Sequence, residues 1–224
     1  TTLFRSTLNF GGRREDGTTP YRLGDQDLSL FFGQSSFSQY VVTRASNAVV
    51  VDPEVDLTLL GPLGCGIQTG SGTVLNRLKP VIGESIVVFG CGAVGLSAIM
   101  AAKLTGCSQI IAVDIHASRL ALAGELGATH QINGKEQDAV ALIKQLTGKG
   151  AHYAVETTGV SAIVLQAVHA VKPLGTVAIV GFTGDITLNV QNDLMAEGKS
   201  LVGVIEGDAV PALFIPLLVQ LYKQ

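Results

Sequence analysis

The sequence predicts an α/β protein with a doubly wound parallel sheet, and three observations lead to this fold class. From about residue 84 onward, short apolar runs alternate with longer amphipathic segments, as strands and helices do around a parallel sheet. A Gly-x-Gly-x-x-Gly motif, Gly90 to Gly95, joins the first apolar run to the first amphipathic segment. The composition agrees, because 47% of the residues are hydrophobic and only 15% are charged, which is typical of a compact fold.

The elements follow in chain order. We expect strands where short apolar runs occur, at 85–89, 109–113, 130–132, 151–155, 175–180 and 201–205. We expect helices where the segments between them are amphipathic, at 93–105, 117–126, 136–147, 160–171 and 210–222. Six strands in this alternation would complete two βαβαβ halves of a dinucleotide-binding sheet.

The first 80 residues have a different pattern. Residues 37–43 alternate like a half-buried strand, and residues 48–51 predict another strand that ends at Asp52-Pro53. A glycine-rich segment at 61–72 leads into a predicted helix at 73–78. We therefore expect two parts, with residues 1–80 as the end of a mostly β domain plus a connecting helix, and residues 81–224 as the dinucleotide-binding domain.

The glycine motif predicts a binding site for a diphosphate. Gly90 permits the tight turn from strand to helix, Gly92 lets backbone approach a pyrophosphate, and Gly95 lets the helix pack closely on the strand. The helix begins at Ala93 and Val94, whose free N–H groups would bind the phosphates. A glycine turn without a ligand is the alternative, but the acid at the end of the next strand argues against it.

That acid is Asp114, and it indicates which cofactor is bound. We expect its carboxylate to accept hydrogen bonds from the adenosine ribose, and it would repel a 2′-phosphate, so NAD is favoured over NADP. Arg119 lies nearby and could contact an adenosine phosphate or ribose, or form part of a solvated rim with His116.

Charge and cysteine content exclude several other classes. The formal net charge is −3 and there is no basic cluster, so binding to nucleic acid or to a membrane surface has no electrostatic support. No apolar run has the length of a membrane span. The three cysteines form no disulfide framework, and reduced thiols in the cytoplasm are the simplest interpretation.

The motif Gly61-Pro62-Leu63-Gly64-Cys65-Gly66-Ile67-Gln68-Thr69-Gly70, followed by the fingerprint, resembles the zinc-dependent medium-chain alcohol dehydrogenases. Further matching pieces are Phe37-Ser38-Gln39-Tyr40, Val155-Glu156-Thr157-Thr158-Gly159 and Val180-Gly181-Phe182. Among the members, the chain is most similar to the aryl-alcohol (benzyl alcohol) dehydrogenases. The resemblance implies a Rossmann domain that follows the end of a GroES-like catalytic domain. It also implies a partial copy, which lacks the N-terminal catalytic and structural-zinc region and the C-terminal segment.

The resemblance implies a catalytic zinc ion, with Cys65 as one ligand. A thiolate near a helix start is stabilised and is a good ligand for Zn²⁺, whereas Cys65 without the resemblance would be a buried structural thiol. The other ligands and the proton-relay residues lie upstream in the family, so no catalytic base is assigned within this chain. Zinc would polarise the oxygen of an alcohol while hydride passes to NAD.

The resemblance also assigns cofactor and substrate contacts. Besides the fingerprint and Asp114, the expected cofactor contacts are Thr69, Thr157, Thr158, Val180, Phe182 and Ile205. The residues that could line the substrate pocket are Phe31, Phe32 and Phe182, although adjacent aromatic residues are more often plain core. Glu156 is expected to shape a loop. The implied partners are an alcohol or aldehyde and further copies of the chain, as a homodimer or homotetramer.

Three alternatives stay open at this point. A zinc-free quinone oxidoreductase of the same superfamily would bind no metal, and Asp114 and Cys65 both argue against it. A glutathione-dependent formaldehyde dehydrogenase shares most of the motifs. A non-catalytic NAD-binding fragment is the alternative of another class.

Overall fold

The computed structural model describes residues 11–14, 16–30, 39–40, 43 and 45–224. The chain divides into two compact units, one made of residues 1–55 with 210–224 and the other of residues 56–209. The predicted strand at 37–43 lies largely outside the described residues. The predicted division at residue 80 concerns the longer family architecture and stays a prediction.

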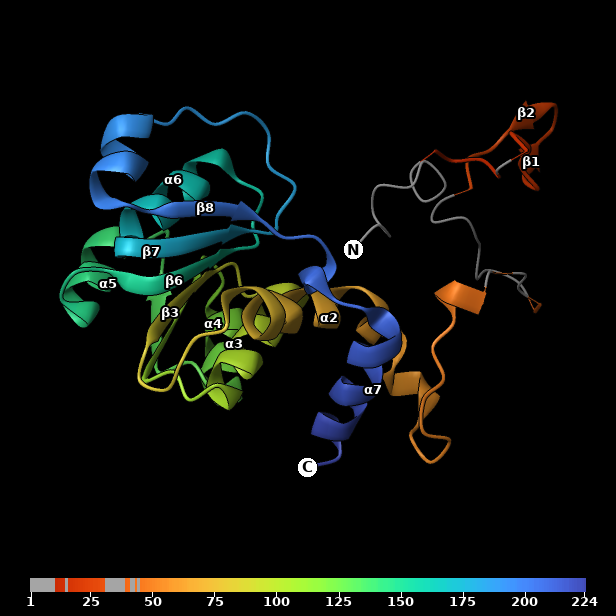
Figure 1. The fold of residues 1–224 in the computed structure, drawn as a ribbon, viewed down its shortest axis with the longest axis horizontal. Helices are drawn as coiled ribbons and strands as arrows, with labels where there is room; N and C mark the ends of the chain where they lie inside the picture. The colour runs from red at the N-terminus through yellow and green to blue at the C-terminus, as the bar shows by residue number, and fades with distance from the viewer. Residues whose placement is uncertain (1–10, 15, 31–38, 41–42, 44) are drawn as a thin grey trace. The chain divides into compact units, whose positions relative to one another are not determined.

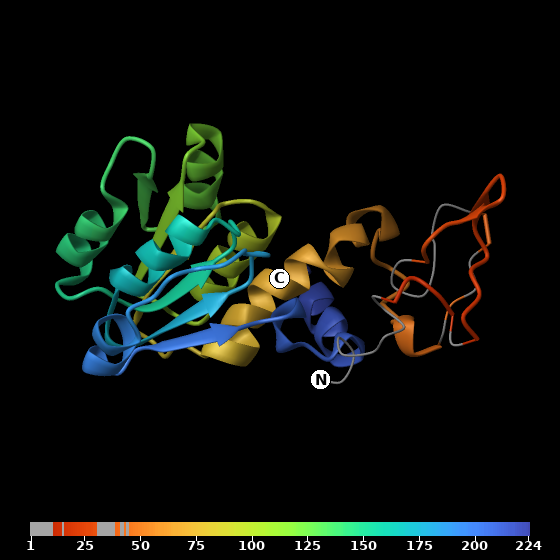
Figure 2. The ribbon, with the colours of Figure 1, turned by 90° about the horizontal axis from the view of Figure 1, so that it is seen from above.

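The 56–209 unit is a six-stranded parallel sheet with helices on both faces (Figures 1 and 2). Its strands are β3 Ser85–Phe89, β4 Gln109–Asp114, β5 His130–Asn133, β6 Ala151–Glu156, β7 Val171–Ile179 and β8 Ser200–Gly203. Its α-helices are α2 Gly66–Gly72, α3 Ala93–Leu104, α4 Ala117–Leu126, α5 Ala139–Thr147 and α6 Ser161–Ala170. The predicted fold class is confirmed, since each of the six expected strands and the helices between them is present.

The strands lie in the order β5-β4-β3-β6-β7-β8. The chain starts in the middle with β3, moves outward to β5, returns to β6 beside β3, and moves outward to β8. The register is parallel throughout, and Ile86 on β3 pairs with Ile110 on β4 and with Tyr153 on β6. The direction of winding reverses between β3 and β6, which is the point where such sheets bind ligands at their carboxyl ends.

Two hydrophobic clusters fill the two faces of this sheet. Successive side chains of a strand point to opposite faces, so Ile86 and Val88 join the cluster that contains residues of α3, whereas Val87 and Phe89 join the cluster that contains residues of α5 and α6. All four are at most 1% exposed. Burial on both faces explains why the strands are continuous apolar runs rather than alternating ones.

Glycines let α2 lie very close to α3 and to the backbone of Gly207. A Cβ on Gly70 would lie 1.9 Å from the carbonyl oxygen of Val94 on α3, and a Cβ on Gly72 would lie 2.5 Å from the carbonyl oxygen of Gly207. Helix α2 begins at Gly66 and continues as the π-helical η6, Thr73–Leu78. The sequence predicted a helix only for 73–78, because glycine is a poor helix former.

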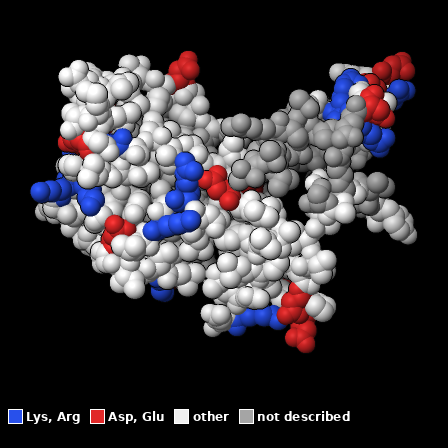
Figure 3. All heavy atoms as spheres, in the orientation of Figure 1, with Lys and Arg blue, Asp and Glu red and all other residues white. Residues whose placement is uncertain are grey.

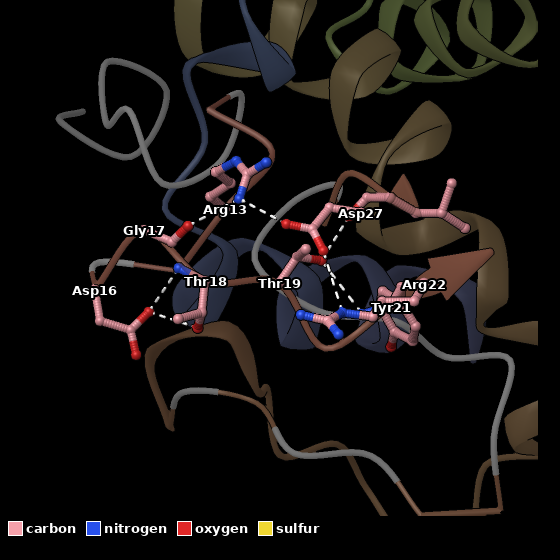
Figure 4. A network of polar contacts seen from close by, with 9 residues as sticks. Arg13, Asp16, Gly17, Thr18, Thr19, Tyr21, Arg22 and Asp27 are labelled. Carbon is pink, nitrogen blue, oxygen red and sulfur yellow. Dashed lines mark hydrogen bonds and ion pairs between the residues drawn. The ribbon is translucent and has the colours of Figure 1, made fainter. Parts of the chain in front are cut away.

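The 1–55/210–224 unit contains the short hairpin β1 Arg22–Leu23 and β2 Gln26–Asp27, and the helix α7 Pro211–Tyr222. Figure 4 shows the polar contacts around the hairpin, in which Asp27 forms ion pairs with Arg13 at 3.3 Å and with Arg22 at 3.2 Å. These pairs are exposed, so they contribute little stability. The predicted strand at 48–51 is wrong, because these residues form no ladder and Val50 is 90% exposed.

The face of the molecule drawn in Figure 3 carries its charges in small separate groups. On the face drawn in Figure 3, Lys and Arg side chains are interspersed with Asp and Glu side chains among larger uncharged areas. Among the helices of the described residues, none is both long and apolar enough to cross a lipid bilayer.

Candidate functional site

The glycine motif forms the turn between β3 and α3. Gly90 has a φ of +90°, a conformation that strains any side chain, and its N–H donates to the carbonyl oxygen of Val113 on β4 at 2.8 Å. A Cβ on Gly95 would lie 1.8 Å from the carbonyl oxygen of Gly90, so only glycine allows α3 to start this close to the strand. A Cβ on Gly92 would meet no described atom within 4 Å, so the space over this residue is open.

Helix α3 begins directly at this open space. Its N-cap residue is Gly92, which has no side chain to cap the helix. The N–H groups of Ala93, Val94 and Gly95 belong to the first turn, where a helix offers no internal acceptors, and the helix dipole makes this end positive. The turn therefore provides unhindered donors and a favourable potential for an anionic group such as a diphosphate.

Asp114 lies at the carboxyl end of β4 and is bound to the same turn. Its Oδ2 accepts the N–H of Cys91 at 2.7 Å and its Oδ1 accepts the N–H of His116 at 2.9 Å, while Nη1 of Arg119 lies 3.9 Å from Oδ2. The residue is 7% exposed. Each carboxylate oxygen can accept a further hydrogen bond, so Asp114 can hold a polar ligand beside the turn from Gly90 to Gly95.

Cys91 sits inside the motif with its thiol fully buried. Burial, together with the nearby Asp114 carboxylate and against a smaller lowering by Arg119, raises the pKa of the Cys91 thiol to about 12. The thiol is therefore kept protonated, as expected of a residue that fills the motif and takes no part in chemistry.

The loop after β6 borders the turn on its other side. Thr157 donates its hydroxyl to the carbonyl oxygens of Phe89 and Gly90, at 2.9 and 3.0 Å. The buried carboxylate of Glu156 accepts the N–H and the hydroxyl of Thr158, and the N–H of Gly159 at 3.2 Å. Glu156 thus shapes this loop.

The loop after β7 packs against the same segment. The N–H groups of Val180 and Gly181 donate to the carbonyl oxygen of Glu156, at 2.9 and 3.1 Å, and a Cβ on Gly159 would lie 2.6 Å from the carbonyl oxygen of Phe182. The side chain of Phe182 is fully exposed. The other aromatic residues expected in the substrate pocket, Phe31 and Phe32, lie outside the described residues.

A second group of polar side chains gathers where α2 meets the end of β8. Cys65 precedes α2, and its Sγ lies 3.7 Å from Oε1 of Glu206. The other carboxylate oxygen of Glu206 accepts the amide of Gln68 at 2.9 Å and the hydroxyl of Thr69 at 3.3 Å. Ile205 is 58% exposed and directly precedes this carboxylate. The sequence placed Glu206 at the end of a strand but gave no signal for its contact with Cys65, which is 141 residues away.

The Cys65 thiol is not activated in the described structure. Burial raises the pKa of Cys65 above its ordinary value, and the charge and hydrogen bond of Glu206 raise it further. The role of Cys65 as a zinc ligand stays a prediction.

A zinc ion with three protein ligands is not completed by the described residues. They contain no group of three or more His, Cys, Asp or Glu side chains that could hold a metal ion. Cys65 and Glu206 provide one sulfur and one carboxylate, fewer than the three protein ligands of catalytic zinc sites. The open turn, the bare helix end and Asp114, by contrast, match the requirements of a bound dinucleotide.

Comparison with known proteins identifies relatives along almost the whole chain. The family model described as zinc-binding dehydrogenase matches residues 93–223. Geraniol dehydrogenase from Castellaniella defragrans is 42% identical over 96% of the chain, and a probable alcohol dehydrogenase from Pseudomonas sp. is 44% identical over 90%. The crystal structure of benzyl alcohol dehydrogenase from Acinetobacter calcoaceticus superimposes with a TM-score of 0.88, at 48% identity over 97% of the chain. An alcohol dehydrogenase zinc-binding domain protein from Burkholderia ambifaria gives a TM-score of 0.90 at 49% identity.

The relatives are longer than this chain. The chain covers 59% of the length of the geraniol dehydrogenase, 66% of the Pseudomonas protein and 59% of the benzyl alcohol dehydrogenase.

Proposed function

Because the chain belongs to the zinc-binding dehydrogenases, we propose that it binds NAD and serves the transfer of hydride between an alcohol and that cofactor. The observation that carries the proposal is the phosphate turn, in which the space over Gly92 is open beside the start of α3 while Asp114 is hydrogen-bonded to the same turn through Cys91. The nicotinamide, when bound, accepts hydride from the carbinol carbon, and the alcohol proton is released.

The residues of this chain have binding and orienting roles in this proposal. The N–H groups of Ala93, Val94 and Gly95 bind the diphosphate, and Asp114 accepts hydrogen bonds from the adenosine ribose, with Arg119 at its edge. Asp114 also disfavours a 2′-phosphate by charge repulsion, so the proposed cofactor is NAD rather than NADP.

The remaining proposed contacts line the carboxyl ends of β6, β7 and β8. Thr157, Thr158, Val180 and Phe182 border the bound cofactor there, and Thr69 and Ile205 border its nicotinamide end. Cys65 is the proposed contribution of this chain to a zinc site. Since the described residues do not complete that site, no proton transfer or polarisation step is assigned to it.

The substrate we propose is a primary alcohol whose carbinol carbon is attached to an unsaturated carbon. Two relatives support this choice by name, since benzyl alcohol is benzylic and geraniol is allylic. A developing carbonyl next to an unsaturated carbon is stabilised by conjugation. The exposed ring of Phe182 offers a surface on which such a planar substrate could pack.

Two measurements test the proposal in order. Isothermal titration of the protein with ADP-ribose, NADH and NADPH should give binding of the first two and at least about tenfold weaker binding of NADPH, which is the discrimination expected from one repulsive charge. Rates should then be compared for matched pairs, benzyl alcohol with cyclohexylmethanol and geraniol with its saturated analogue. Higher kcat/KM for the unsaturated member of each pair supports the substrate class, and equal values reject it. Phe182→Ala should raise the KM for benzyl alcohol more than that for short aliphatic alcohols.

A second candidate function is oxidation of S-(hydroxymethyl)glutathione. A probable S-(hydroxymethyl)glutathione dehydrogenase from Schizosaccharomyces pombe is 34% identical over 95% of the chain. Turnover of this thiol adduct at a rate above that of benzyl alcohol would favour the second candidate. The zinc-free quinone oxidoreductase alternative predicts instead a preference for NADPH in the titration above, and a non-catalytic fragment predicts binding without turnover.

We further propose that the protein acts in the cytoplasm as a homodimer or homotetramer. Its three cysteines are all free, which suits a reducing compartment. Strand β8 forms one edge of the six-stranded sheet, and such an edge can pair with a second copy. Sedimentation equilibrium would distinguish these states from a monomer.

A further inference from the structure

The carboxylate of Glu206 has no positive partner among the described residues. Its three contacts, with Cys65, Gln68 and Thr69, are all with neutral groups, and none of the ion pairs found in the described part of the chain includes it. Gln68 and Thr69 are only 2% and 7% exposed, so the carboxylate is held by buried side chains. A negative charge positioned in this way without a counter-charge favours a cation nearby.

The backbone that presents this carboxylate is strained. Glu206, Gly207 and Asp208 have φ values of +51°, +67° and +48°, and two of the three have a side chain that disfavours this conformation. Contacts from η6 hold the turn in place, since Asn76 donates to the carbonyl oxygen of Gly207 at 3.0 Å and Arg77 pairs with Asp208 at 3.4 Å. Strain that neighbouring contacts maintain in this way is typical of a functional site.

The topology places Asp114 and Glu206 on opposite sides of the turn after β3, since they follow β4 and β8. In the proposed binding mode the diphosphate lies at the turn after β3, and the adenosine lies beside Asp114, which follows β4 on one side of β3. The other nucleoside must therefore extend across the carboxyl ends of β6, β7 and β8. Glu206 lies three residues after the end of β8, and its partners Gln68 and Thr69 lie on α2, which packs against α3 through Gly70.

The oxidised and reduced cofactors differ in charge at this end. The nicotinamide ring carries one positive charge in NAD⁺ and none in NADH, while the adenosine diphosphate part is the same in both. We propose that Glu206 is a further specificity-determining residue, whose carboxylate raises the affinity for NAD⁺ relative to NADH. The inference rests on the proposed function, because it needs a dinucleotide bound at the phosphate turn. It adds to that function one charge that shifts the relative affinity toward the oxidised cofactor.

Binding equilibria without substrate test this directly. Kd values for NAD⁺, NADH and ADP-ribose are measured by isothermal titration in the presence of EDTA, for the wild type, Glu206→Gln and Glu206→Asp. The matched control is Glu197→Gln, which removes a carboxylate that pairs with Lys199 on the surface of the same unit. Circular dichroism confirms that each variant is folded.

The ratio of the Kd of NAD⁺ to that of NADH should rise about fivefold in Glu206→Gln, as expected for loss of one partly solvated charge pair. Glu206→Asp should keep most of the preference, and Glu197→Gln should leave the ratio unchanged. ADP-ribose should bind equally to all four proteins, because it lacks the nicotinamide. An unchanged Kd ratio in Glu206→Gln, including the case in which binding of NAD⁺ and NADH weakens equally, overturns the inference while the proposed function stands.

Failure of ADP-ribose to bind the wild type would instead overturn the proposed function and this inference together. If Glu206→Gln does not fold, the wild type supplies the decisive measurement. Raising the salt concentration screens the attraction between carboxylate and ring, so the Kd ratio should rise with ionic strength after correction for the salt dependence of ADP-ribose binding. A corrected ratio independent of salt contradicts the inference.

Discussion

Replacing two glycines of the turn from Gly90 to Gly95 by alanine should have different effects. Gly95→Ala should lower the stability of the fold, whereas Gly92→Ala should weaken ligand binding. In Gly95→Ala the new Cβ would lie 1.8 Å from the carbonyl oxygen of Gly90, whereas in Gly92→Ala it would meet no described atom within 4 Å. The atom that Gly95→Ala strikes belongs to the backbone, so no side-chain rotation relieves the clash. Helix α3 would have to move away from β3, whose residues are almost completely buried.

The free energies follow from these distances. Moving a packed helix to admit one methyl group typically costs about 1–3 kcal/mol of unfolding free energy, and the clash with backbone places Gly95→Ala at the upper end of that range. Gly92 has a φ of −78°, which alanine adopts without strain, so Gly92→Ala should change the unfolding free energy by less than about 1 kcal/mol. The added methyl group of Gly92→Ala instead occupies the space proposed for the diphosphate, and we expect it to weaken ADP-ribose binding at least about tenfold, or about 1.4 kcal/mol.

The two variants are compared by urea unfolding, followed by circular dichroism, and by titration with ADP-ribose. The expected result is a lower midpoint for Gly95→Ala at wild-type m-value, and a wild-type midpoint with weak binding for Gly92→Ala. Gly184→Ala is the control, because a Cβ there also meets no described atom within 4 Å but lies outside the turn. Wild-type affinity in Gly92→Ala would refute the placement of the diphosphate over this residue.

Three further predictions follow from single side chains. Asp114→Asn should lower the ratio of the Kd of NADP to that of NAD about tenfold, since it removes the charge that opposes a 2′-phosphate; an unchanged ratio in titration would exclude that role. His152 accepts the N–H of Ser85 through Nδ1 at 3.1 Å, so its ring is neutral in the fold, and burial together with the charge of Lys172 lowers the pKa of His152 below its ordinary value of 6.5. Its contribution to stability is therefore complete above pH 6.5 and is lost as the pH falls through the lower folded pKa, so His152→Gln should flatten the dependence of the urea midpoint on pH in this range. Cys91, with its pKa raised to about 12, should remain unmodified by iodoacetamide in the native protein at pH 8 and react after unfolding, as peptide mass spectrometry would show.

The sequence predicts strands and helices well where burial is the dominant cause. The expected bounds 85–89 and 117–126 coincide with β3 and α4. In both elements the spacing of apolar residues records which faces are buried, and that information is local. Prediction failed at 48–51, where three successive valines favour a strand by propensity. A strand also needs a partner for its backbone, and the described residues of that unit pair only β1 with β2.

In the candidate site, too, the features that depend on neighbouring residues in the sequence are predictable, whereas those that depend on distant residues are not. The turn from Gly90 to Gly95 and the acid at Asp114 are predictable because a local motif specifies them. The start of α2 at Gly66 and the contact between Cys65 and Glu206 are not, because both depend on segments that are far away in the sequence. The glycines of α2 lower its helix propensity, so the sequence favours a loop there. The same glycines are required for the close contacts of α2 with Val94 and Gly207.

The charges at the carboxyl edge of the sheet form an ordered pattern. Asp114 provides a carboxylate after β4, the positive end of α3 follows β3 in the middle, and Glu206 provides a second carboxylate after β8. A dinucleotide in the oxidised state presents ribose hydroxyls, then a negatively charged diphosphate, then a positively charged ring. In the proposed binding mode each section would therefore meet a group that attracts it, and reduction of the ring would remove only the attraction at Glu206. In the proposed binding mode, the two redox states of the cofactor would therefore be distinguished through Glu206, whereas the turn and Asp114 would bind both states alike.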